Sequence, residues 1–127
     1  MGQTRNRDKS PIRIRQFGVY LVNLNPGIGT KPGKIRPCIV IQNNALNEGG
    51  HPSTVVLPTT TQVRDLHAFP LQIFLPKGEG GLLKDSAVLV DQILAWDNRL
   101  FKKKLGTLSP EKIQELERAV RDFFGWP

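Results

Sequence analysis

The chain has 127 residues, 39% of them hydrophobic, and a formal net charge of +7, so it can close one modest core and has no room for two. It contains no run near the ~20 apolar residues that a membrane-spanning helix needs. The first sixteen residues are basic but lack the apolar segment of a secretory signal, so we expect a cytoplasmic protein. The lone Cys38 cannot form an internal disulfide, and its apolar surroundings indicate a core thiol rather than a nucleophile.

Much of the positive charge lies at the N-terminus. Residues 1–16 hold five basic residues against Asp8 alone, a net +4, which leaves +3 of the total +7 for the remainder. The segment is polar and poor in aromatic residues, so we predict a disordered tail over 1–16 and a single domain over 17–127. Its charge suits sequence-independent attraction to phosphates and suits a solvated extension equally well, so we assign it no specific role.

From residue 17 onward, short apolar runs alternate with polar turns rich in glycine and proline. The run Val19–Leu24 has apolar residues at both odd and even positions, which indicates a strand buried on both faces. A loop with three glycines, two prolines and two lysines separates it from the next strand, Pro37–Ile41. Further strands are predicted over Thr54–Pro58, Phe69–Leu75 and Ser86–Ile93, with a polar turn over Asn43–Ser53.

Five or more short strands separated by turns predict a mainly β fold in the form of a small β-barrel. One helix is expected near the end of the chain. Ser109 suits the N-cap of this helix, Pro110 its first position and Gly125 its C-terminal end. The apolar residues between them recur at helical spacing and predict a core-facing stripe: Ile113, Leu116, Val120, Phe123 and Phe124.

Four sequence blocks follow one another in a recognisable order. They are GVYLVNLNP with KIRPCIVIQN after the glycine-rich loop, TVVLPTTTQ, SAVLVDQILAWD and LGTLSPEKIQELERAV. In this order and spacing they resemble the MazF/PemK-type toxin endoribonucleases of type II toxin–antitoxin systems, over nearly all of the chain from Gly18 to Gly125. The resemblance implies an SH3-like β-barrel, a fold shared with gyrase poisons, and a homodimer that cleaves single-stranded mRNA.

The sequence lacks the usual signatures of metal and cofactor sites. It has no Cys/His cluster with zinc spacing, no Walker motif, no dinucleotide glycine motif that opens a helix, and no HExxH. We therefore expect neither a metal nor a cofactor. A ribonuclease without metal is chemically accessible because RNA brings its own nucleophile, the 2′-OH, which attacks the adjacent phosphate once the two are held in line.

Arg36 is the leading candidate for a catalytic residue. It stands where the basic loop enters a strand, and its planar fork of N–H donors stays charged and matches a phosphate bidentately. In the family, the Arg of the Arg-Pro motif and the Thr that closes the second block form the catalytic pair, which maps onto Arg36 and Thr60. Thr59 and Thr61 are alternatives one position away, and the general base is left open.

RNA-binding residues are also implied by the resemblance. The basic loop between the first two strands resembles a mobile cover over the family's substrate groove, and other polar positions resemble its lining. The implied positions are Asn25, Lys31 and Lys34 in the loop, and Gln62, Ser86 and Gln92 beyond it. Asp91 stands where the family usually has Glu, a change that can alter which bases are accepted. Phe17, Tyr20 and Trp96 are open to two interpretations, as a stacking ring for a base or as core residues.

The resemblance implies one protein partner. Toxins of this type are neutralised by a small antitoxin whose acidic, partly disordered C-terminal segment blocks the RNA groove. A basic groove and a disordered acidic segment are physically compatible, because binding orders the segment and pairs its charges. Two other functions remain as alternatives: a non-enzymatic toxin that inhibits DNA gyrase through its C-terminal helix, and an SH3-like module that binds nucleic acid without cutting it.

Overall fold

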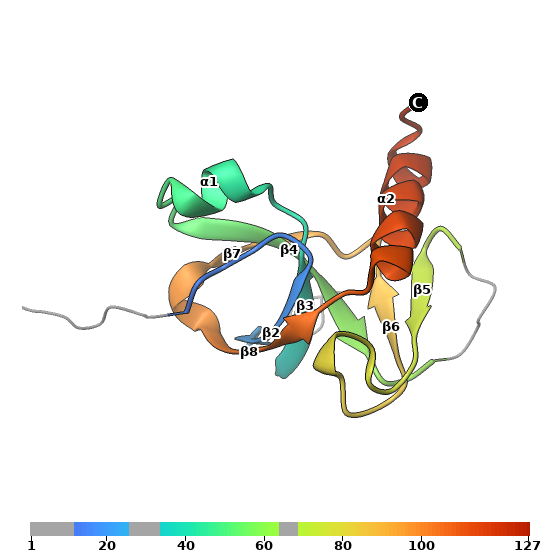
Figure 1. Ribbon diagram of the computed structural model, residues 1–127, viewed down its shortest axis with the longest axis horizontal. Helices are drawn as coiled ribbons and strands as arrows, with labels where there is room; N and C mark the ends of the chain where they lie inside the picture. The colour runs from blue at the N-terminus through green and yellow to red at the C-terminus, as the bar shows by residue number, and fades with distance from the viewer. Residues whose placement is uncertain (1–11, 26–33, 64–68) are drawn as a thin grey trace, which may run out of the picture.

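The computed structural model describes residues 12–25, 34–63 and 69–127, and in this part of the chain it confirms a mainly β fold with a C-terminal helix (Figure 1). The strands are β2 (Gly18–Asn23), β3 (Ile35–Val40), β4 (Ser53–Thr60), β5 (Gln72–Leu75), β6 (Ser86–Leu89), β7 (Leu94–Asp97) and β8 (Phe101–Thr107). The helices are α1 (Asn44–Glu48) and α2 (Pro110–Phe124), with single 3-10 turns η1 (Glu79–Gly81) and η2 (Asn98–Leu100).

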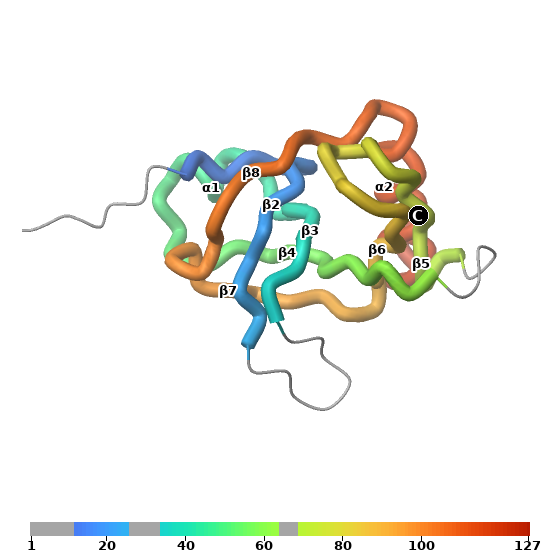
Figure 2. The backbone as a smooth tube through the Cα atoms, turned by 90° about the horizontal axis from the view of Figure 1, so that it is seen from below, coloured from blue at the N-terminus to red at the C-terminus, as the bar shows by residue number. Residues whose placement is uncertain are grey.

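The strands form one antiparallel sheet. Its hydrogen-bonded order among the described residues is β5-β6-β4-β3-β2-β8, and β7 pairs with β4. The first half of β4 pairs with β7, and its C-terminal end pairs with β6. Figure 2 shows β2 beside β3, with β8 on the other side of β2. Pairing within the described residues does not continue from one end of this order to the other, so the predicted closed barrel is not confirmed.

The central strands separate two hydrophobic clusters. Val19, Ile39 and Leu57 belong to the first cluster, which α2 covers with Leu116 and Ala119. The second cluster lies on the other face and comprises Tyr20, Val22, Leu24, Cys38, Val40, Val56, Leu94 and Phe101. Burial on both faces confirms the prediction for the first strand. It also fixes the pairing register, because a slip by one residue would exchange the residues that face the two clusters.

Four segments differ from the sequence prediction. The strand predicted over Phe69–Leu75 begins only at Gln72, because the three residues before it form a turn. The predicted strand Ser86–Ile93 is wrong as a single element: the chain turns after Leu89, where the N–H of Gln92 bonds the Leu89 carbonyl, and β7 then pairs with a different part of β4. The polar segment Asn43–Ser53 contains the short helix α1, capped by the Asn43 side chain. Strand β8 was not predicted, because a run of three lysines carries little apolar signal.

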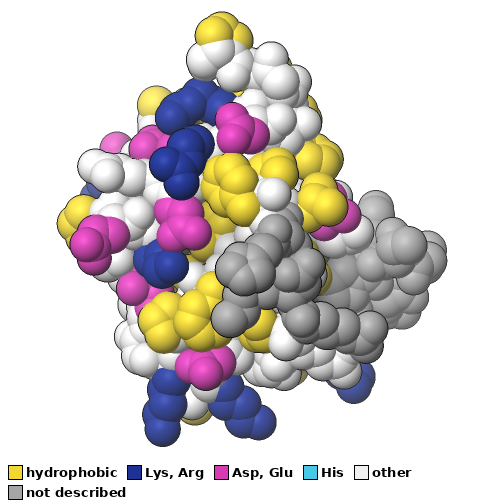
Figure 3. All heavy atoms as spheres, turned by 90° about the vertical axis from the view of Figure 1, so that its right-hand side faces the viewer, with side chains coloured by type: hydrophobic (Ala, Val, Ile, Leu, Met, Phe, Trp, Pro, Cys, Tyr) yellow, Lys and Arg dark blue, Asp and Glu magenta, His cyan; other side chains and the backbone are white. Residues whose placement is uncertain are grey.

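Helix α2 begins and ends as predicted. Ser109 Oγ accepts the N–H of Lys112 at 3.3 Å, and Gly125 closes the helix with a φ of 71°. The core-facing stripe is confirmed only in its first part, because Leu116 is buried whereas Phe123 and Phe124 are 37% and 43% exposed. Figure 3 looks onto the side of α2 and β5 and shows hydrophobic side chains at the surface among charged ones.

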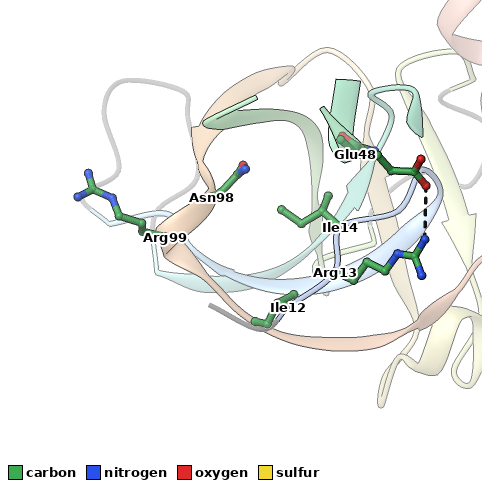
Figure 4. Close-up of a pocket in the computed structure, with 7 residues that line it drawn as sticks. Ile12, Arg13, Ile14, Glu48, Asn98 and Arg99 are labelled. Atoms are coloured by element: carbon green, nitrogen blue, oxygen red, sulfur yellow. Dashed lines mark hydrogen bonds and ion pairs between the residues drawn. The ribbon is translucent and has the colours of Figure 1, made fainter. Parts of the chain in front are cut away.

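Residues 12–16, which belong to the predicted tail, lie against the sheet, and residues 1–11 are outside the described residues (Figure 4). The Tyr20 hydroxyl accepts the N–H of Arg15 at 2.9 Å and donates to the carbonyl of Arg13 at 2.7 Å. Burial raises the pKa of this hydroxyl, so it keeps the proton that it donates. Both arginines pair with Glu48 of α1, and Ile14 packs on the second cluster.

The connection between β5 and β6 is packed tightly against β8, as Figures 1 and 2 both show. A Cβ added to Gly81 would lie 2.2 Å from the carbonyl oxygen of Leu105, and one added to Gly106 would lie 2.7 Å from that of Gly80. Gly81 also has a φ of +79°, which L side chains rarely adopt. Glycine is therefore required where the two backbones meet.

This contact predicts that Gly81→Ala lowers the free energy of unfolding by more than ~2 kcal/mol, because the variant combines an unfavourable φ with a backbone clash. Gly50→Ala is the matched control: its φ is +80°, but no atom lies within 4 Å of the added Cβ. The control should lose only ~1 kcal/mol. Denaturant unfolding monitored by circular dichroism measures both. Equal losses would show that the close approach at Gly81 does not constrain the fold.

Candidate active site

A polar hollow of about 330 Å³ opens where β3 begins and β4 ends. The two strands are antiparallel, with Cys38 paired to Pro58, so the start of one lies beside the end of the other. This register brings together residues that are more than twenty positions apart in the chain. The hollow is lined by Lys34, Ile35, Arg36, Pro37, Thr60, Thr61 and Gln62.

Arg36 is held in this hollow by the neighbouring strand. Its side chain is half-buried, and its Nη1 donates to the backbone carbonyl of Thr59 at 3.1 Å. Thr59 in turn donates from Oγ1 to the carbonyl of Pro37 at 2.8 Å. Both residues of the Arg-Pro pair are thus fastened to one threonine, so the guanidinium has a defined place at the edge of a rigid sheet.

The structure distinguishes the three consecutive threonines. Thr59 is 2% exposed and is turned into the sheet, where it does not line the hollow. Thr60 and Thr61 both line it. Thr60 Oγ1 accepts the N–H of Gln62 at 3.1 Å, which uses an oxygen lone pair and not the hydroxyl proton. Thr60 therefore lies beside Arg36 and retains the capacity to donate a hydrogen bond.

The base of the loop between β2 and β3 forms one side of the site. Asn25 Oδ1 accepts the N–H of Lys34 at 2.6 Å, and the N–H of Leu24 donates to the Lys34 carbonyl at 2.8 Å. These bonds hold the backbone of Lys34, which has a positive φ of 69°, at the edge of the hollow. Lys31 is outside the described residues, since the loop is described only up to residue 25 and again from residue 34.

The other two predicted RNA-binding residues lie outside this hollow. Ser86 is 2% exposed, donates from Oγ to the Lys84 carbonyl at 3.0 Å, and lines a smaller neighbouring hollow. Gln92 follows the far end of β6 and lines neither of the two. The predicted residues that meet in one place are therefore Lys34, Arg36, Thr60 and Gln62.

Sequence reasoning did not assign the residues that shape the hollow and hold Arg36. Ile35 and Pro37 form walls of the hollow, and Thr59, which the sequence offered only as an alternative catalytic threonine, positions Arg36. The pairing register of β3 with β4 is the signal that identifies them. Tyr20 is completely buried, and Trp96 donates from Nε1 to the carbonyl of Asn23 at 2.7 Å while it packs on the second cluster, so both serve the core.

The described lining of the hollow is basic. It holds Lys34 and Arg36 and no acidic residue. Within residues 12–25, 34–63 and 69–127, no group of three or more His, Cys, Asp or Glu is placed to bind a metal ion. No helix in the same part of the chain is long and apolar enough to cross a membrane. A basic, hydroxyl-bearing hollow of this kind suits a phosphate group.

Comparison with known proteins assigns a family. Residues 15–124 match the family described as PemK-like, MazF-like toxin of type II toxin-antitoxin system. The chain belongs to this family. A relative at the level of sequence is the Endoribonuclease MazF of Staphylococcus saprophyticus, which is 34% identical over 107 residues, or 84% of this chain and 88% of the relative.

Solved structures of MazF toxins share the fold at lower sequence identity. A MazF from Deinococcus radiodurans has a TM-score of 0.74 at 21% identity and covers 90% of this chain and 98% of its own. A mycobacterial endoribonuclease, solved in complex with its cognate antitoxin, has a TM-score of 0.72 at 21% identity; the match covers 90% of this chain and 97% of the mycobacterial one. The antiparallel sheet with its C-terminal helix is thus the fold of MazF structures.

In this MazF-like toxin, Cys38 follows the Arg-Pro pair directly but is not exposed to the hollow. It is completely buried, and burial raises the pKa of its thiol to about 12. Its Sγ lies 3.7 Å from the carbonyl of Arg36. Because a thiol reacts as the thiolate, a pKa this high makes Cys38 a packing residue of the second cluster, as predicted.

The folded protein should therefore resist thiol reagents. At pH 8 the thiolate is roughly one part in 10⁴, so a disulfide reagent such as dithiobis(nitrobenzoic acid) should release almost no chromophore over an hour. The same protein in guanidinium chloride should react completely within minutes. Rapid stoichiometric labelling of the native protein would contradict the core assignment and would place a reactive thiol next to Arg36.

Proposed function

We propose that this chain is the toxin of a toxin–antitoxin module and that it acts as an endoribonuclease on single-stranded mRNA. The observation that carries the proposal is the meeting of Arg36 and Thr60 in one basic hollow, in a chain of the MazF-like family. The relative in Staphylococcus saprophyticus is named an endoribonuclease, and it covers most of this chain. Site and family therefore point to the same activity.

The proposed reaction is attack of the 2′-oxygen on the adjacent phosphorus. A bond forms between these atoms, and the bond from phosphorus to the 5′-oxygen of the next nucleotide breaks. One proton leaves the 2′-hydroxyl and one reaches the 5′-oxygen, which leaves a 2′,3′-cyclic phosphate and a 5′-hydroxyl end. A reaction without a metal ion belongs to the same proposal, because the 2′-hydroxyl is a nucleophile that the RNA itself supplies.

Arg36 is assigned to the charge that develops on the phosphate oxygens. A hydrogen bond from Nη1 to the Thr59 carbonyl holds the guanidinium in place, and its planar, permanently charged fork has the geometry that matches a phosphate. The Thr60 hydroxyl is assigned to a further hydrogen bond with a non-bridging oxygen. Donors that are fixed before the substrate arrives stabilise a transition state without reorganising, which is the most effective form of electrostatic catalysis.

The remaining polar residues are proposed to hold the RNA strand. Lys34 and Gln62 line the hollow, and Asn25 fixes the backbone of Lys34, so these three act closest to the phosphate. Lys31, Ser86 and Gln92 are retained as RNA-binding candidates on the family resemblance. Recognition of single-stranded RNA then depends on bases that lie outside a helix and are gripped individually.

An SH3-like barrel is the proposed description of the sheet. Strands β8, β2, β3, β4 and β7 surround the second cluster in this order, and η2 joins β7 directly to β8. The bond from Trp96 Nε1 to the Asn23 carbonyl connects β7 to the end of β2, although no strand pairing among the described residues closes the ring.

Two protein partners complete the proposal. The first is an antitoxin, since one structural relative is bound to its cognate antitoxin and the described lining of the hollow here is basic. The second is another copy of the chain. Exposed apolar side chains at the end of α2, Phe123, Phe124 and Trp126, leave surface for such a contact. A cytoplasmic location, where mRNA is found, belongs to the same proposal.

The test is cleavage of a long single-stranded RNA by the purified chain in excess EDTA, with mapping of the ends. Arg36→Ala should lower the rate by at least ~10²-fold, because it removes a donor that stabilises transition-state charge. Arg36→Lys should recover only part of the rate, since an ammonium keeps the charge and loses the fork. Arg99→Ala is the matched control, because Arg99 is exposed and pairs with Asp97 away from the hollow.

Two results would contradict this function. Intact RNA after incubation with folded protein would exclude the nuclease, and inhibition of gyrase or binding without cleavage would then identify which alternative holds. Equal rates for Arg36→Ala and Arg99→Ala would leave a nuclease whose active site lies elsewhere.

A further inference from the structure

A second, smaller hollow adjoins the candidate active site. Its volume is about 190 Å³, and two residues, Pro37 and Thr61, line both hollows, so the two lie side by side. The rest of its lining includes four leucines, Leu21, Leu82, Leu83 and Leu105, and Lys84. We call it the leucine hollow. It lies between the connection from β5 to β6 and strands β2 and β8.

The packing of backbone on backbone at Gly81 creates this hollow. The approach of Gly81 to the Leu105 carbonyl brings the following residues alongside β8. Leu82 is then 3% exposed and anchors the segment, whereas Leu83 is 82% exposed. Among the exposed large hydrophobic side chains of the described residues, Leu83 has the highest exposed fraction. An apolar side chain in this position has no role in the core and is available to a ligand.

Charges stand on two sides of the apolar lining. Lys84 lines the hollow directly. Lys103 of β8 is the register partner of Leu21, and Leu21 is the register partner of Pro37, so the three stand in a row across the sheet. Register partners in antiparallel strands project to the same face. An apolar surface flanked by lysines matches a single strand of nucleic acid, whose bases are apolar on their faces and whose phosphates are anionic.

We infer that the leucine hollow is a nucleobase subsite for the nucleotide next to the cleaved phosphate, and that Lys84 contacts a phosphate of the same strand. This inference rests on the proposed function, because it takes the Arg36 hollow as the place of the cleaved phosphate. Because Pro37 and Thr61 border both hollows, a nucleotide next to a phosphate bound at Arg36 would lie close to the leucine hollow. The apolar side chains contact the flat face of the base, a surface that all four bases share.

Binding of an RNA that cannot be cut tests the inference apart from catalysis. Single strands of about ten nucleotides with 2′-O-methyl groups lack the attacking hydroxyl, and fluorescence anisotropy measures their Kd. Leu83→Ser should raise the Kd by about tenfold, the effect of one lost base contact. Lys84→Gln should raise the Kd and lower the salt dependence of log K by roughly 0.7, the value for one phosphate contact on a single strand.

Two variants serve as matched controls. Leu46→Ser removes an exposed leucine of α1, which is 49% exposed and lines neither hollow. Lys104→Gln removes one charge from the neighbouring position on β8, where the Lys104 ammonium lies over the Tyr20 ring at 5.9 Å, on the face away from Leu21. Both should bind within about twofold of the unmodified chain, since neither side chain borders the leucine hollow.

An abasic scan locates the base. Each base of the best-bound strand is removed in turn, and one position should raise the Kd of the unmodified chain by about tenfold. In Leu83→Ser, removal of that same base should have little further effect, because the contact is already lost. Non-additivity at a single position is the signature of a direct contact, and a general loss of folding or charge does not produce it.

The outcomes separate this inference from the proposed function. Equal Kd values for Leu83→Ser and Leu46→Ser, or additive losses at every abasic position, would overturn the subsite even if the chain cuts RNA. The expected pattern in the 2′-O-methyl strands, together with failure to cut ordinary RNA, would support the subsite and overturn the nuclease. Failure of the unmodified chain to bind any single strand would overturn both.

Discussion

The two hydrogen bonds of Thr59 are the constraint on which the candidate site depends. Its carbonyl accepts from Arg36, and its hydroxyl donates to the carbonyl of Pro37, so one buried residue of β4 fixes both residues of the Arg-Pro pair near the start of β3. Thr59 is fixed in turn by its pairing with Val88 of β6. The position of the Arg36 guanidinium is thus fixed by the sheet and not by the loop that precedes β3. This is expected for a site that must be organised before its substrate binds.

The register of the sheet that places Thr59 is set by the two hydrophobic clusters. Val19, Ile39 and Leu57 enter one cluster, and residues next to them in sequence, such as Tyr20, Val40 and Val56, enter the other, so a slip by one residue would exchange the side chains of the two clusters and lose their close packing. Burying both faces of β2, β3 and β4 leaves little freedom for the strand ends. A small domain can therefore hold a charged side chain and a row of threonines in fixed positions with no metal or disulfide among the described residues.

Strand β2 links the two hollows. On one side it pairs with β3, which carries Arg36, and on the other with β8, against which the Gly81 connection packs. Leu21 of β2 and Pro37 of β3, which are register partners, both contribute to the lining of the leucine hollow. The basic hollow proposed for the phosphate and the apolar hollow proposed for a base are thereby joined through the same three strands, and their separation is fixed by strand geometry.

The sequence by itself determined the elements whose signals are local. These are the apolar run of β2, the Arg-Pro start of β3, the threonine run of β4 and the caps of α2 at Ser109 and Gly125. Only the tertiary structure decided that Thr59 is turned away from the hollow while Thr60 and Thr61 line it, that the predicted strand from Ser86 breaks in two, and that β8 forms from a lysine run. These outcomes depend on strand pairing between residues distant in sequence. Hydrophobic periodicity predicts which face of a sheet a residue occupies, but it does not predict which strand that residue pairs with.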